Sequence, residues 1–240
     1  MNNSRGTMPW RFFDVIMSAF VVILILSNIA SSAKIVDLKM SIANIDLIFD
    51  GGTLIFPLSY ILGDILTEVY GFRASRRVIW TGFGLSALAA LVFFVLNLLP
   101  GEQAWEAYAG SAAYNSILGG MSAGGIVLAS LAGFFAGEFS NSMLLSRIKV
   151  LMNGRLLPFR TIVSTLVGEF LDSIIFIGVA TLTGVFPPEL FWALILTNYV
   201  LKCSIEIIFT PLTCLISARL KRAEKIDIFD RGVIYNPFGF

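Results

Sequence analysis

Residues 78–99 read VIWTGFGLSALAALVFFVLNLL, a run without a single charged side chain. A helix that crosses the hydrocarbon core of a bilayer needs about 20 predominantly apolar residues, and this run meets that length. The composition of the whole chain agrees, because 57% of its side chains are hydrophobic, 14% are charged and the mean hydropathy is +0.84. A soluble domain usually carries about 25% charged residues. The sequence therefore predicts an all-α integral membrane protein.

Five other segments reach a comparable length on either side of this run. Proline marks the ends of two of them, at Pro100 and at the pair Pro187-Pro188, since proline cannot continue a helix. We expect six transmembrane helices that form a single transmembrane domain over residues 1–240. The predicted spans are residues 13–33, 53–70, 78–99, 118–146, 161–186 and 190–218.

The charges are segregated although they nearly cancel, with 17 Lys and Arg, 16 Asp and Glu, and a net charge of +1. Most basic residues lie before the first predicted span or after the second, fourth and sixth, whereas Lys34 and Lys39 lie on the opposite side. Connections rich in Lys and Arg stay in the cytoplasm, so we expect both termini to be cytoplasmic. Topology and attraction to the anionic lipid bilayer account for these clusters, and we expect no nucleic-acid partner. The cytoplasmic basic residues are Arg5, Arg11, Arg73, Arg76, Arg77, Arg147, Lys149, Arg155, Arg160, Arg219, Lys221, Arg222, Lys225 and Arg231.

Several classes of activity are excluded by what the sequence lacks. It contains no histidine, which removes the commonest general base, the His-ligated metal site and the Ser-His and Cys-His dyads. It has no G-x-x-x-x-G-K-[ST] loop, so the chain is not itself an ATPase. We therefore expect a protein that is not an enzyme and that has no catalytic residues, no cofactor and no metal.

Acidic side chains lie inside the predicted spans, where each charge costs about 2.5–3.5 kcal/mol and usually serves a function. At about 1.5 Å per residue from the flanking arginines, Asp172 lies about 18 Å deep, and Asp64 and Glu138 lie about 13 Å deep. Acids from three helices therefore approach one layer near the middle of the membrane. Lys202 and Glu206 lie four residues apart with opposite charge, so a purely structural ion pair remains an alternative for these two.

Two short strings in these spans are nearly alike. Residues 137–142 read GEFSNS and residues 168–173 read GEFLDS, with residues 63–65 (GDI) as a weaker echo. Short polar segments that recur at the centres of apolar spans are typical of transporters that are built from related halves and bind their substrate near the midplane.

A longer string points to a family. Residues 57–71 read PLSYILGDILTEVYG and are followed by Arg76-Arg77, which resembles the signature of the queuosine precursor transporter family, also called the vitamin uptake transporter family. The resemblance covers roughly residues 27–212. Its other matching positions are Asn28, Lys34, Arg160-Thr161, Ser164-Thr165, Asp172-Ser173, Tyr199, Lys202 and Pro211.

This resemblance implies a multi-pass protein of the bacterial inner membrane that imports queuosine precursors. The substrates would be 7-cyano-7-deazaguanine and 7-aminomethyl-7-deazaguanine, salvaged for the modification of tRNA. The fold is expected to be similar to that of the substrate-binding subunits of energy-coupling-factor vitamin transporters. One departure is Glu169, where the family commonly carries a neutral amide.

The chemistry of such a base suits the buried residues. A guanine-type ring presents two adjacent N–H donors that a carboxylate accepts in a bidentate manner, and its carbonyl oxygen needs a donor such as Arg, Lys or Asn. Aromatic side chains, among them Phe56 and Phe170, could stack on the ring. The candidate substrate-binding residues are Asp64, Glu68, Asp172, Arg160, Lys202, Asn28, Glu169, Glu138, Asn141, Ser164, Tyr60 and Tyr199.

Two alternatives remain open at this stage. The chain could be the substrate-binding subunit of an ATP-driven vitamin-type importer, or a membrane-embedded hydrolase that uses paired carboxylates. The identity of the base, the coupling mode, including transport of protons by buried acids, and the oligomeric state, including a homo-oligomer, are also left open.

Overall fold

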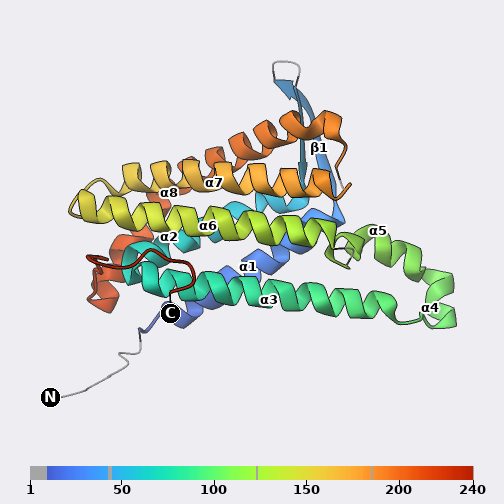
Figure 1. Cartoon of the computed structure of the whole chain (residues 1–240), viewed down its shortest axis with the longest axis horizontal. Coiled ribbons are helices and arrows are strands. Elements are labelled where there is room, and N and C mark those ends of the chain that lie inside the picture. Colours follow the sequence, from blue (N-terminus) through green and yellow to red (C-terminus); the bar gives the residue numbers. More distant parts are fainter. Residues whose placement is uncertain (1–9, 43–44, 123, 185, 240) are drawn as a thin grey trace.

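The computed structural model describes residues 10–42, 45–122, 124–184 and 186–239. Long helices lie side by side and a β-hairpin projects from one end of the bundle (Figure 1). The six principal helices are α1 (Phe13–Ala33), α2 (Phe56–Tyr70), α3 (Phe72–Leu98), α6 (Gly125–Leu151), α7 (Leu157–Leu182) and α8 (Phe191–Glu224).

Five of these helices, α1, α3, α6, α7 and α8, are long and apolar enough to cross a membrane. The fifth span consists of α8 and the short 3₁₀ helix η2 (Pro188–Leu190) directly before it. The five helices correspond to five of the predicted spans and confirm a helical membrane protein. The second predicted span differs, because α2 has 15 residues and is preceded by the 3₁₀ helix η1 (Gly51–Leu54). A helix of this length is about 22 Å long, shorter than the hydrocarbon core.

The bounds of several predicted spans differ in the structure, and α3 and α7 begin at Phe72 and Leu157 rather than at residues 78 and 161. The span predicted for residues 118–146 is divided between α5 (Gly110–Ser122) and α6, which runs on to Leu151. The break falls in a glycine-rich stretch, where Gly124 has a φ of +79° that ends regular helix. α7 ends at Leu182 rather than at residue 186, and α8 continues through Pro211 to Glu224 rather than ending at residue 218. Residues 123 and 185 lie outside the described residues.

Two elements outside the predicted spans are additional findings. Strands β1 (Ile35–Ile42) and β2 (Ile45–Asp50) form an antiparallel hairpin in which Ile35 pairs with Asp50. Each segment contains two isoleucines, and residues 36–42 of β1 alternate apolar with polar side chains, which favours strands. The short helix α4 (Gln103–Tyr108) follows α3 and is capped by the carboxylate of Glu102, which accepts a hydrogen bond from the Trp105 amide at 2.9 Å.

The two similar strings meet where α6 crosses α7. A β-carbon on Gly137 would lie 2.9 Å from the carbonyl oxygen of Gly168, and one on Gly168 would lie 3.0 Å from that of Gly137. The same β-carbons would lie 2.8 Å from the Cβ atoms of Asp172 and Asn141, respectively. Gly137 therefore faces Gly168 and Asp172, and Gly168 faces Gly137 and Asn141. A local two-fold relation connects the two strings.

The start of α1 and the end of α8 lie at the same end of the bundle. The backbone amides of Arg11 and Phe12 donate to the carboxylate of Glu224 at 3.0 and 2.7 Å. The α2–α3 and α6–α7 connections and the C-terminal segment 226–239 lie at this end as well, and the hairpin lies at the opposite end (Figure 1). We call these the basic end and the hairpin end. Of the basic residues predicted on one side, Arg5 lies outside the described residues.

Candidate functional site

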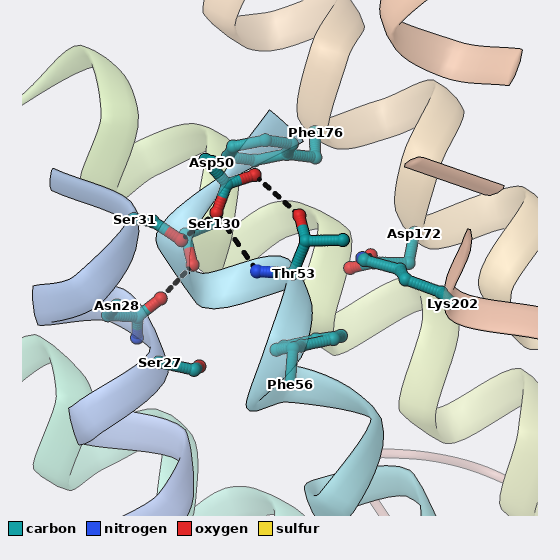
Figure 2. Close-up of a pocket in the computed structure, with 10 residues that line it drawn as sticks. All are labelled: Ser27, Asn28, Ser31, Asp50, Thr53, Phe56, Ser130, Asp172, Phe176 and Lys202. Carbon is teal, nitrogen blue, oxygen red and sulfur yellow. Dashed lines mark hydrogen bonds and ion pairs between the residues drawn. The ribbon is translucent and has the colours of Figure 1, made fainter. Parts of the chain in front are cut away.

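A pocket lies beside the last residue of β2, between α1, η1, the start of α2, α6, α7 and α8 (Figure 2). It encloses about 320 Å³, including space that is open to solvent. The space that the centre of a water molecule can occupy inside it is about 30 Å³, well below the volume of ordinary ligand pockets, about 300–1,000 Å³. The lining residues are Ser27, Asn28, Ser31, Asp50, Thr53, Phe56, Ser130, Asp172, Phe176 and Lys202.

Asp50 organises the wall of the pocket that is formed by the hairpin. Its Oδ1 accepts hydrogen bonds from the Gly52 amide at 2.9 Å and from the Ser31 hydroxyl at 2.5 Å, and its Oδ2 accepts from the Thr53 hydroxyl at 2.9 Å. These bonds cap η1 and fasten the hairpin to α1. Asp50 was not among the predicted residues, although Asp-Gly-Gly directly before an apolar run is typical of a helix N-cap.

Lys202 is the central cation of the pocket. Its ammonium group donates a hydrogen bond to the Asp172 carboxylate, lies 3.4 Å from Glu169 Oε2 and sits 4.2 Å from the centre of the Phe56 ring. The alternative that Lys202 pairs with Glu206 is therefore wrong. The two carboxylates on the facing helix α7 attract the ammonium group more strongly than the single one a turn away on α8.

Beneath the pocket, acidic side chains from four helices are buried together. We call Asp64 of α2, Glu138 of α6, Glu169 of α7 and Glu206 of α8 the acid layer, and none is more than 1% exposed. The carboxyl group of Glu138 interacts electrostatically with those of Asp64, Glu169 and Asp172. The acids that the sequence places at similar depth are therefore neighbours, and Glu206 joins them.

Hydrogen bonding within this layer is incomplete. The Asn141 amide donates to Asp64 Oδ1 at 2.8 Å. Within the described part of the chain, neither carboxyl oxygen of Glu138 or of Glu206 has a hydrogen-bond partner, nor does the buried hydroxyl of Tyr60. Unpartnered buried polar atoms are rare in proteins, and they concentrate here in one place.

A second group of charges, at the basic end, is fully paired. Glu68 of α2 accepts from both terminal nitrogens of Arg160 at 2.7 and 3.1 Å and from Lys221 at 2.5 Å. Lys149 lies 3.7 Å from Glu68 and donates to Asp227 at 2.6 Å, and Lys221 lies 2.9 Å from Asp227. We call these five residues the paired cluster. Although burial favours the neutral acid, the hydrogen bonds from the two lysines hold the pKa of Asp227 below its ordinary value.

The predicted binding residues thus fall into separate places. Tyr199 donates its hydroxyl to the Leu166 carbonyl at 3.2 Å, and Ser164 bonds to the Thr161 carbonyl within its own helix. Asn28, Asp172 and Lys202 line the pocket; Tyr60, Asp64, Glu138, Asn141 and Glu169 lie in or beside the acid layer; Glu68 and Arg160 belong to the paired cluster.

Of the aromatic residues considered for stacking, Phe56 lines the pocket and Phe170 does not. Phe170 is 47% exposed on the outer face of the bundle and meets the Tyr199 ring edge-on at 6.0 Å. Phe176 takes its place in the pocket. The sequence contains a signal for this residue, because Phe176 follows Asp172 by four positions and so shares its helix face.

Comparisons with known proteins were consistent with one another. Residues 50–216, well over half of the chain, match the family model described as putative vitamin uptake transporter. The chain is 28% identical over 161 residues to the probable queuosine precursor transporter of Bacillus subtilis (strain 168), an alignment that covers 67% of this chain and 68% of that protein. No solved structure matches the chain.

Proposed function

The chain belongs to the putative vitamin uptake transporter family, and from this membership we propose that it imports queuosine precursors for salvage into tRNA. It is a multi-pass membrane transporter and not an enzyme, and in a bacterium such a protein resides in the inner membrane. The proposed substrates are 7-cyano-7-deazaguanine and 7-aminomethyl-7-deazaguanine. The observation that carries the proposal is the Asp172–Lys202 ion pair in a pocket with two aromatic side chains.

The pocket offers the groups that such a base requires. The Asp172 carboxylate accepts from the ring N–H and the 2-amino group, and Lys202 donates to the carbonyl oxygen. Phe56 and Phe176 supply apolar ring surfaces on which the base can lie (Figure 2). Asn28 accepts a hydrogen bond from the Ser130 hydroxyl at 2.5 Å through its carbonyl oxygen, so its amide nitrogen is oriented as a further donor.

The proposed topology has six spans, with α2 as the short one, and both ends of the chain in the cytoplasm. The accumulation of Lys and Arg at the basic end supports this orientation. The pocket then lies toward the outside, while the acid layer and the paired cluster separate it from the cytoplasm. Such an arrangement represents the outward-facing state of an importer, with a fold similar to that of energy-coupling-factor substrate-binding subunits.

Uptake of labelled 7-cyano-7-deazaguanine by cells that cannot make it tests the proposal. We expect expression of the chain to restore uptake and Asp172→Asn to reduce it by at least about tenfold, since a hydrogen bond to a charged group contributes about 1.5–3 kcal/mol. Glu189→Gln, at an exposed carboxylate in the connection before α8, is the matched control and should leave uptake unchanged. Undiminished uptake with Asp172→Asn would contradict the proposed site. Uptake that the purified chain alone cannot reproduce in liposomes would instead indicate an ATP-driven partner.

A further inference from the structure

The acid layer contains more carboxyl groups than the surrounding cations can neutralise. Lys149, Arg160 and Lys221 are all engaged by Glu68 at the basic end. Lys202 is therefore the only cation left to face Asp172 and the acid layer among the described residues, and it pairs with Asp172. Adjacent carboxylates that share one low-dielectric site cannot all ionise, so part of the layer must hold protons.

Glu206 is as poorly satisfied as Glu138, and it is the acid that lies on the same helix as Lys202. Its side chain is 1% exposed, neither oxygen has a hydrogen-bond partner in the described part of the chain, and its carboxyl group interacts electrostatically with those of Asp64, Glu169 and Glu138. It lies one helical turn from Lys202 on the same face of α8. Any movement of the Lys202 ammonium group therefore changes the electrostatic field at Glu206.

The surroundings of Glu206 do not form a metal site. Within the described residues, no three acidic, cysteine or histidine side chains converge as they would around a metal ion. Glu138 instead lies against α2, where a β-carbon on Gly63 would come within 1.9 Å of its Oε1, and the Tyr60 hydroxyl lies against Gly137 in the same way. Unpartnered carboxyl and hydroxyl oxygens that are spread over four helices suit the smallest cation, a proton, rather than a coordinated metal ion.

We propose that the acid layer binds one proton together with each base, and that Glu169 and Glu206 share this proton. The inference rests on the proposed function. When the base draws Lys202 toward its carbonyl oxygen, Glu169 loses the ammonium group that lies 3.4 Å away and takes up the proton. Base and proton thus bind cooperatively and travel in the same direction, and the proton leaves as Lys202 returns.

The groups that face this proton site define its response to pH. They are Tyr60 and Asp64 from α2, Glu138 and Asn141 from α6, Arg160 and Asp172 from α7, and Tyr199, Lys202 and Cys203 from α8. Apart from Lys202 and the distant Arg160, which is bound to Glu68, these groups are neutral or acidic. Once Lys202 has moved to the base, uptake of a proton therefore relieves repulsion between the acids without opposing a nearby cation.

The test uses the purified full chain in liposomes with 7-cyano-7-deazaguanine, which is a neutral base, and with the membrane potential clamped to zero. Exchange of labelled for unlabelled base without any gradient reports binding and transport. Net accumulation of the base, measured with the outside one pH unit more acidic than the inside, reports coupling to protons. Transport of one proton with each base should drive the ratio of inside to outside base concentration toward about tenfold. We expect the wild type to show both activities. Glu206→Gln should keep exchange within about twofold and lose accumulation, and Glu189→Gln should keep both.

A second measurement needs no variant. Addition of 7-cyano-7-deazaguanine to the wild type in weakly buffered detergent solution should cause uptake of protons, and the affinity for the base should rise as the pH falls. The absence of both effects would overturn the inference, and so would accumulation that follows a sodium gradient or that persists in Glu206→Gln. Loss of exchange in a Glu206→Gln protein that unfolds at the wild-type temperature would also overturn it. If the wild type exchanges no base at all, the proposed function itself fails.

Discussion

Asp64 and Glu68 are neighbours on one face of α2, and their surroundings differ completely. Glu68 is bound by Arg160 and Lys221 and lies close to Lys149, whereas Asp64 accepts one hydrogen bond from the neutral amide of Asn141. A buried carboxylate that is matched by cations forms a rigid, closed contact between helices. A buried carboxyl group without a cation keeps the capacity to gain or lose a proton or a ligand. In the mechanism that we propose, the paired cluster holds the basic end of the transporter closed and the acid layer binds the transported proton.

The difference follows from the distance to the membrane surface. Three cations, Lys149, Arg160 and Lys221, lie near the ends of α6, α7 and α8 at the basic end. Lys and Arg are common at this end because connections rich in them stay on the cytoplasmic side during membrane insertion. The acid layer is too far along the helices for these side chains to reach. Lys202 is the one cation at that depth in the described residues, and the carboxylates of α7 hold it.

The largest effect is expected from breaking the paired cluster. Arg160→Met leaves Glu68 buried beside fewer cations, and removal of one partner from a buried ion pair costs about 3–5 kcal/mol. Thermal unfolding in detergent should show a large loss of stability or no folded protein. The double variant Glu68→Gln with Arg160→Met should recover part of the loss, and a single variant as stable as the wild type would refute the role of the cluster.

A smaller effect is expected from the crossing of α6 and α7. Gly137→Ala places a methyl group 2.9 Å from the Gly168 carbonyl oxygen and 2.3 Å from the Tyr60 hydroxyl, and overpacking of this kind costs about 1–3 kcal/mol. Gly84→Ala is the matched control, because no atom lies within 4 Å of its β-carbon and alanine favours the helix. Equal melting temperatures for the two variants would show that α6 and α7 do not depend on this close approach.

Replacement of an acid in the acid layer should change stability much less than the same replacement in the paired cluster. Glu138→Gln keeps the shape of the side chain and removes a carboxyl group that no hydrogen bond satisfies, so we expect a change within about 1 kcal/mol. Glu68→Gln, which breaks contacts to three cations, is the comparison. If the two variants lose stability equally in thermal unfolding, the distinction between the two regions is wrong.

The smallest effect concerns Asp227, which is 45% exposed at the edge of the paired cluster. Because its pKa is lowered in the folded protein, its carboxylate stabilises the fold above its pKa in the unfolded chain, and this contribution disappears as the pH falls through the folded-state pKa. Solvent screening limits it to about 1 kcal/mol or less. Asp227→Asn should therefore unfold slightly earlier than the wild type at pH 7. The difference should vanish under strongly acidic conditions, and a difference that grows toward acid would contradict the assignment.

The apolar runs were sufficient to predict the long helices, because a membrane span is a local property of the sequence. The gathering of Asp64, Glu138 and Asp172 also followed from depth, since helices that start at the same surface reach the same layer at the same residue count. The hairpin was missed because its short segments do not resemble spans. The division between α5 and α6 was missed because glycines are tolerated in membrane helices.

The pairing of charges could not be predicted in the same way. Glu68 and Arg160 are both predicted as substrate ligands, but only the packing of α2 and of α7 against α6 and α8 reveals that they bind each other. Likewise, the i, i+4 spacing favours contact between Lys202 and Glu206, and the facing acids of α7 override it. Contacts between helices depend on the rotation of each helix about its axis, and a single sequence leaves that rotation undetermined.

The most direct test of the account is the affinity of the purified chain for 7-cyano-7-deazaguanine, measured by calorimetry for the wild type, Asp172→Asn and Glu189→Gln. The account predicts that the wild type and Glu189→Gln bind the base equally well. It also predicts that Asp172→Asn, compared as a folded protein that still shows a cooperative thermal transition, binds at least about tenfold more weakly. Equal affinity of Asp172→Asn and the wild type would contradict the assignment of the pocket as the substrate site.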